Sequence, residues 1–145
     1  MLKVFEEEIQ KALRHVPYLS EAQRPIAAHE LFRVLYAKSM ALDPMRLSLP
    51  PLLDQCWHAL ILETELYVRF CKQVFRNGKL LHHTQHTIDD APLEKKKRIE
   101  RMRAFYRTIF GNQLLPELWT QEGEEGEVQQ GKRKRIEEEE SRVFV

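Results

Sequence analysis

The chain has 145 residues, of which 43% are hydrophobic and 31% are charged, as in an ordinary globular protein with a charged surface. No apolar run approaches the roughly 20 residues that cross a bilayer, and residues 1–8 lack the basic start and apolar centre of a secretion signal. We therefore expect a cytoplasmic or nuclear protein that neither spans a membrane nor is secreted.

The formal net charge of +1 is unevenly distributed along the chain. Residues 1–120 carry 18 Lys or Arg against 14 Asp or Glu, whereas residues 121–145 carry 5 against 8. The second segment also lacks periodic apolar residues, so it cannot bury enough surface to offset the loss of chain entropy on folding. We predict one helical domain over residues 1–120 and a disordered charged tail over residues 121–145.

Two helices are predicted before residue 43. Apolar residues recur at helical spacing from Leu2 to Val16, and this helix should end before Pro17. A second helix should begin near Ser20 or Pro25 and continue to about residue 42, because Ser20 and Gln23 have the spacing of a capping box. Residues 43–50 then read as a loop.

A third helix is predicted from the Pro50-Pro51 pair to the Asn77-Gly78 pair. Its apolar residues cover a wide arc, which indicates a largely buried helix at the centre of the fold. Along one continuous helix, Cys56 and Cys71 would lie roughly 22 Å apart at about 1.5 Å per residue. No disulfide can join them at that distance, so both cysteines should be reduced.

A long connection over residues 79–91 should lead to a fourth helix that starts at Pro92 and stops at Gly111. Leu114, Leu115, Leu118 and Trp119 should pack as a short closing turn. The chain shows no strand alternation, repeat or glycine-rich phosphate loop. The predicted fold is all-α, a compact bundle of about four main helices with a disordered charged C-terminal tail.

Asp54 and His58 lie one helical turn apart on the predicted third helix. A carboxylate at this spacing can fix one imidazole nitrogen and leave the other for a proton or a metal. If the long connection folds back, His82, His83 or His86 could join them, so a divalent metal such as zinc is one hypothesis. The alternatives are acid/base catalysis and a structural polar pair beside Trp57. No nucleophile has an activating context, so the catalytic residues stay unassigned.

The predicted fourth helix is strongly basic over residues 95–107. It carries seven cations, Lys95, Lys96, Lys97, Arg98, Arg101, Arg103 and Arg107, against the single acid Glu100. Such a run can bind nucleic-acid phosphates, although the solvated face of a charged helix looks the same. In the tail, Lys132 to Arg135 matches the short basic clusters that nuclear import receptors read, and it can equally pair with Glu137 to Glu140.

The stretch from Leu47 to Cys71, together with the later His82-His83, resembles the glycine-rich domain-containing protein-like family. That family shows a pattern of Asp-x-x-Trp-His-x-x-Ile-Leu-x-Thr-x-x-Tyr-x-x-Phe-Cys followed by His-His, and the matching residues here are Asp54, Trp57, His58, Thr64, Tyr67, Cys71, His82 and His83. Thr84-Gln85 departs from the pattern, where a proline is expected. The resemblance covers about residues 25–110 and implies a helical module without an established activity.

The leading hypothesis is a small intracellular helical module with a protein-interaction or structural role and a buried Asp/His polar cluster. The lack of an assembled catalytic set leans against an enzyme. The two alternatives are a metal-binding protein or metal-dependent enzyme that uses Asp54, His58, His82 and His83, and a nucleic-acid-binding protein that uses residues 95–107.

Overall fold

The computed structural model describes residues 3–42, 46–83 and 91–120. Over these residues the chain forms five α-helices, three short 3-10 helices and no β-strand, which confirms the predicted all-α fold. In chain order the elements are α1 (Lys3–Ala12), η1 (Leu13–His15), α2 (Arg24–Ser39), α3 (Pro51–Leu62), α4 (Thr64–Val74), α5 (Pro92–Phe110), η2 (Gly111–Gln113) and η3 (Pro116–Leu118). The predicted tail, with its Lys132–Arg135 cluster, lies outside the described residues.

The turn between α1 and α2 follows the predicted proline and capping signals. Val16 is extended before Pro17, as the residue preceding a proline prefers. Ser20 and Gln23 form the reciprocal bonds of a capping box: Gln23 Oε1 accepts from the Ser20 amide over 2.9 Å, and Ser20 Oγ accepts from the Gln23 amide over 3.2 Å. Tyr18, which follows Pro17, adopts a left-handed backbone conformation with φ of 66°.

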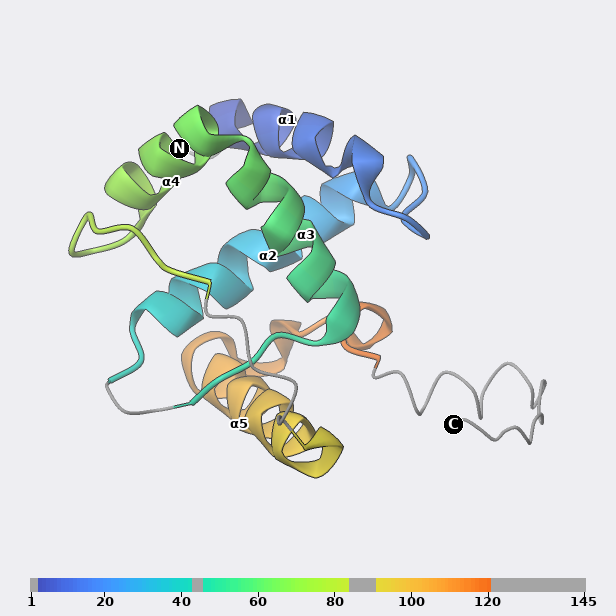
Figure 1. Ribbon diagram of the computed structural model, residues 1–145, viewed down its shortest axis with the longest axis vertical. Coiled ribbons are helices and arrows are strands. Elements are labelled where there is room, and N and C mark those ends of the chain that lie inside the picture. Colours follow the sequence, from blue (N-terminus) through green and yellow to red (C-terminus); the bar gives the residue numbers. More distant parts are fainter. Residues whose placement is uncertain (1–2, 43–45, 84–90, 121–145) are drawn as a thin grey trace.

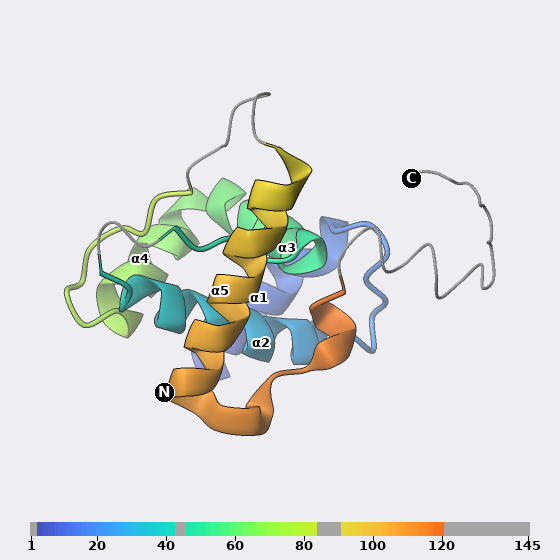
Figure 2. The ribbon, with the colours of Figure 1, turned by 90° about the horizontal axis from the view of Figure 1, so that it is seen from below.

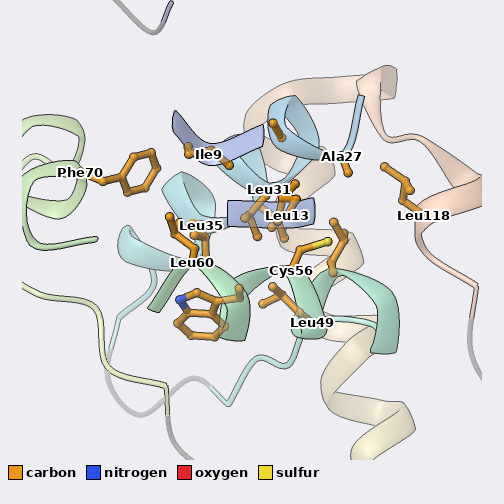
Figure 3. Close-up of a cluster of buried hydrophobic side chains, with 14 of the residues drawn as sticks. Ile9, Leu13, Ala27, Leu31, Leu35, Leu49, Cys56, Leu60, Phe70 and Leu118 are labelled. Atoms are coloured by element: carbon orange, nitrogen blue, oxygen red, sulfur yellow. The ribbon is translucent and has the colours of Figure 1, made fainter. Parts of the chain in front are cut away.

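The predicted third helix contributes α3 to the centre of the fold, and α2 shares that position. α2 contacts α1, α3 and α5, and the small side chains of Ala27, Ala28 and Ala37 on it are buried. Figure 1 shows α2 passing behind α3, with α5 on the far side of the molecule from α1 and α4. Figure 3 shows apolar side chains of α1, α2 and α3 meeting around Leu31. Burying such residues is the main stabilising contribution to the fold, at about 1.5–3 kcal/mol for a large side chain.

The prediction of a single third helix is wrong, because the structure divides this segment into α3 and α4 at Glu63 (Figure 1). Glu63 leaves helical geometry with φ of −89° and ψ of 75°. The break lets Trp57 and Tyr67 meet with a hydrogen bond of 3.0 Å, whereas ten residues of straight helix would separate them by about 15 Å. The wide apolar arc of the predicted helix therefore consists of two narrower apolar faces, one on α3 and one on α4, which pack against the same core. The predicted 22 Å separation of Cys56 and Cys71 assumed a continuous helix and is therefore no longer supported. Both cysteines are free and buried.

α5 begins and ends where the sequence predicts. Pro92 occupies its first turn, and Gly111 follows its last residue with φ of 67°. η2 and η3 then bring Leu118 and Trp119 back into the core, as expected of the closing turn. Within the described ranges, no helix is both long enough and apolar enough to cross a membrane.

Candidate functional site

Asp54 and His58 lie on the solvent side of α3. Pro51 sets the first turn of this helix, which places the Asp54 carboxylate near the positive end of the helix macrodipole. The Asp54 side chain is 44% exposed and His58 is exposed. Both groups can therefore meet another molecule, while the opposite face of α3 packs into the core.

His83 comes back to α3 from the connection that follows α4. Its Nε2 lies 2.9 Å from Oδ1 of Asp54, and its ring packs on Trp57 with 4.4 Å between ring centroids. The His83 side chain is only 15% exposed. Asp54 thus orients a partly buried imidazole, and His83 is the one histidine of the connection that the structure brings to Asp54 among the described residues.

A second set of hydrogen bonds, from Trp57 through Tyr67, holds the same connection. The indole Nε1 of Trp57 donates to the hydroxyl of Tyr67, and this hydroxyl donates to the carbonyl of Leu81. Burial raises the pKa of Tyr67, which keeps the phenol neutral and able to donate. These bonds fix the backbone two residues before His83 and so support the placement of its ring.

Lys38 balances the Asp54 carboxylate from α2. Its Nζ donates to the carbonyl of Leu47 over 2.6 Å and lies 5.9 Å from the ring centroid of Trp57. Burial lowers the pKa of Lys38, and the charge of Asp54 opposes that shift. The site is therefore an electrostatically coupled cluster rather than an isolated acid and histidine.

A pocket of about 390 Å³ opens beside this cluster, between α3 and the end of η1. Its walls are mostly apolar. The lining residues are His15, Val16, Pro17, Asp54, Gln55, His58, Ala59, Leu62 and His83. A largely apolar pocket with a few convergent polar groups is the usual form of a binding site.

The structure brings some, but not all, of the predicted metal ligands to one pocket. Asp54, His58 and His83 line one pocket, with 6.3 Å between the ring centroids of the two histidines, but His82 is exposed and does not line it. Over residues 3–42, 46–83 and 91–120, no three His, Cys, Asp or Glu side chains lie where one metal ion could be held. His86 is outside the described residues. A metal at this pocket stays a prediction without a complete ligand set.

The seven basic residues of α5 do not act as one group. Arg98 is buried and donates from Nε to Ser48 Oγ over 2.9 Å, and Arg103 donates to the carbonyl of Trp119 over 3.1 Å. These two arginines hold α5 against neighbouring segments. The exposed members are Lys95, Lys96, Lys97, Arg101 and Arg107.

The most fully bonded polar group in the described structure, Glu30, was missed by the sequence analysis. Its side chain is fully buried, and its two oxygens accept hydrogen bonds from five donors. The donors are Nε and a terminal nitrogen of Arg33, the Tyr106 hydroxyl, the Leu115 amide and the Trp119 indole. Glu30 falls within the apolar stripe of α2, between Ala27 and Val34. A single acidic residue within an apolar stripe was the sequence signal that could have indicated a buried, hydrogen-bonded carboxylate.

Comparison with known families assigns the chain. A family model described as UCP032817-like matches residues 3–114. The chain belongs to the UCP032817-like family. The match spans every residue that lines the pocket and both partners of the Asp54 to His83 contact. Neither a curated protein nor a solved structure matches the chain.

Membership of the UCP032817-like family overturns the resemblance that we drew from Asp54, Trp57, His58 and the His-His pair. Nothing in the comparisons points to a glycine-rich domain-containing family. The structure gives the physical reason for the error. Asp54, Trp57 and His83 form one local packing and hydrogen-bonding unit, and such a unit reports on how α3 packs with the segment after α4 rather than on the identity of a whole domain.

Proposed function

We propose that the protein is a non-catalytic interaction module that holds an apolar side chain of a partner protein in the pocket between α3 and residues 15–17. The observation that carries the proposal is the pocket itself. Val16, Pro17, Ala59 and Leu62 form an apolar wall, while Asp54, Gln55 and His58 supply hydrogen-bonding groups at the same opening. A side chain seated in such a pocket, with its peptide groups bonded at the rim, is the usual anchor of a protein interface.

Exposed apolar residues next to the pocket support this proposal. Tyr18 is 93% exposed and follows Pro17, and Leu62 is 68% exposed at the end of α3. A left-handed tyrosine backbone costs free energy, about 1–3 kcal/mol, and such strain concentrates at binding sites. Tyrosine is also enriched in interfaces, because its ring is apolar and its hydroxyl can hydrogen-bond. The partner surface therefore extends from the pocket onto these two side chains.

The composition of the pocket favours binding over chemistry. The described residues that line it include no serine, threonine, cysteine, tyrosine or lysine that could act as a nucleophile. One ring nitrogen of His83 is already committed to Asp54. The pocket thus offers recognition groups, and Asp54, the one carboxylate that lines it, is already engaged by His83.

Peptide display on the full-length protein tests the proposal. A library of random 12-residue peptides is panned against the chain, and selected peptides are measured by isothermal titration calorimetry. We expect peptides with a large aliphatic or aromatic residue and a Kd of about 1–100 μM, a range in which one seated side chain dominates affinity. Ala59→Arg, which fills the pocket, should weaken binding by about tenfold or more.

Val68→Arg provides the matched control, because Val68 is 52% exposed on α4 and does not line the pocket. It introduces the same charge and volume and should leave the affinity unchanged. Selected peptides that bind Ala59→Arg as tightly as the unaltered chain would contradict the proposal. So would a library that yields no specific binder.

A further inference from the structure

The outer side of α5 carries a cationic surface that the pocket does not use. We define the α5 basic surface by six exposed residues, Arg46, Lys95, Lys96, Lys97, Arg101 and Arg107. Arg46 belongs to it because Arg101 Nε donates to the Arg46 carbonyl over 3.1 Å, which ties the loop before α3 to this face. None of the six lines the pocket.

The first turns of α5 stand out from the body of the protein. Every residue from Ala91 to Lys97 is exposed in the part of the chain that the structure describes, and Figure 2 shows this end of α5 reaching past the other helices. Positive side chains near a helix N-terminus oppose the macrodipole, so Lys95, Lys96 and Lys97 do not stabilise the helix through it. Apolar burial does not account for them either.

The charges on this surface are only partly balanced. Glu94 lies 3.8 Å from Lys97, and Glu100 lies 3.9 Å from Arg103. Counting the six cations against these two acids leaves a formal charge of +4 on α5 and the adjoining loop. The residues from Lys95 to Arg107 extend over about 18 Å along the axis, which is long enough to meet several phosphates.

We propose that the α5 basic surface binds the phosphate backbone of double-stranded nucleic acid without reading its sequence. The apolar face of α5, with Ile99, Met102 and Tyr106, is already buried, and Leu93 is the one large apolar residue of α5 that is strongly exposed within the described ranges. A helix that binds in a membrane interface needs a free apolar face. Single-strand binding relies on exposed aromatic rings for stacking, and none of the aromatic residues of α5 is exposed. With membrane binding and single-strand stacking disfavoured, contact with the phosphates of a duplex fits the α5 basic surface best.

Fluorescence anisotropy with the full-length chain and a labelled 20-base-pair DNA duplex tests this binding. We expect a Kd of about 1–100 μM at 50 mM salt, weakened about 100-fold at 200 mM if about four phosphates are contacted. The variant Lys96→Glu/Lys97→Glu/Arg101→Glu should weaken binding by at least about tenfold and should reduce the salt dependence. Arg98 and Arg103 are left unchanged because they hold α5 in place.

The control variant is Lys11→Glu/Lys72→Glu/Arg76→Glu. It changes the net charge equally through exposed residues of α1, α4 and the turn after α4, on the far side of the molecule from α5 (Figure 1). It should retain binding to within about threefold. Circular dichroism checks that both triple variants keep their helical content.

Three results would overturn the inference. The first is the absence of duplex binding at 50 mM salt, and the second is an equal loss of binding in both triple variants. The third is binding to phosphatidylserine vesicles without binding to the duplex, which would assign the surface to a lipid headgroup. The peptide experiment on the pocket is independent of all three, because Ala59→Arg and the α5 variants change different faces.

Discussion

Nε2 of His83 lies 2.9 Å from Oδ1 of Asp54, although 29 residues separate them in the chain. The contact closes the segment after α4 against the first turn of α3, and the ring of His83 packs on Trp57 in the same place. His82 is exposed beside it. Two adjacent histidines therefore have different environments, which makes them a matched pair for mutation.

His83→Ala should destabilise the protein, whereas His82→Ala should not. His83→Ala removes the bond to Asp54 and the packing on Trp57, so we expect the free energy of unfolding to fall by about 1–3 kcal/mol. His82→Ala should change it by less than about 0.5 kcal/mol, as is usual for an exposed position. Urea denaturation followed by circular dichroism measures both. Equal effects of the two substitutions would mean that the Asp54 contact contributes nothing.

Glu30 should be among the most sensitive positions of the fold. Glu30→Ala would remove an acceptor from five donors, including the buried Trp119 indole, although Arg33 Nε would keep its bond to the Tyr106 hydroxyl. We expect a loss of about 3–5 kcal/mol in the free energy of unfolding, the usual cost of breaking a buried charge pair by removing one partner. Glu21→Ala, at an exposed position before α2, is the control. A loss at Glu30 no larger than that at Glu21 would contradict the structure.

Local signals explain which parts of this fold could be predicted. Pro51, Pro92 and Gly111 fix helix ends through their own backbone chemistry, and the Ser20 to Gln23 capping box acts over three residues. The break at Glu63 has no proline or glycine to announce it. It depends on the contacts that α3 and α4 make with each other and with the core, which appear only after the chain has folded.

The candidate site divides in the same way. The contact between Asp54 and His83 could be anticipated only as a condition, namely that the connection after the predicted third helix folds back onto that helix. The wall formed by His15 to Pro17 could not, since the turn after α1 has no sequence link to α3. The basic run on α5 was visible as composition, but only the structure separates the anchoring Arg98 from the exposed lysines.

The metal hypothesis makes a prediction that is separate from the peptide experiment. If Asp54, His58 and His83 hold an ion, protein purified without a histidine tag should contain about one equivalent of zinc, iron or manganese. Inductively coupled plasma mass spectrometry measures the content. One equivalent of metal that His58→Ala removes, in a variant that still folds, would support the hypothesis, whereas a content well below one equivalent would contradict it.

Alkaline pH should destabilise the fold through two tyrosines. Burial raises the pKa of both Tyr67 and Tyr106 above the ordinary value of about 10. The folded state therefore holds these protons more tightly than the unfolded state, so the contribution to stability is complete below about pH 10 and is lost as the pH rises through the raised pKa. Urea denaturation at about pH 9 and pH 11 should show the decline, and Tyr67→Phe should make it shallower. A free energy of unfolding that stays constant over this interval would exclude the effect.

The two thiols should be protected in the native state. Burial raises the pKa of Cys56 to about 12, and it raises the pKa of Cys71 as well, so neither forms much of the reactive thiolate near pH 8. Both side chains are also shielded from reagents in solution. We expect Ellman's reagent to modify the native chain at least about tenfold more slowly than the chain unfolded in guanidinium chloride, where two thiols should react. The single variants Cys56→Ala and Cys71→Ala assign any residual reactivity. A native rate equal to the unfolded rate would mean that α3 and α4 open readily, and that the core around Trp57 is less stable than its hydrogen bonds imply.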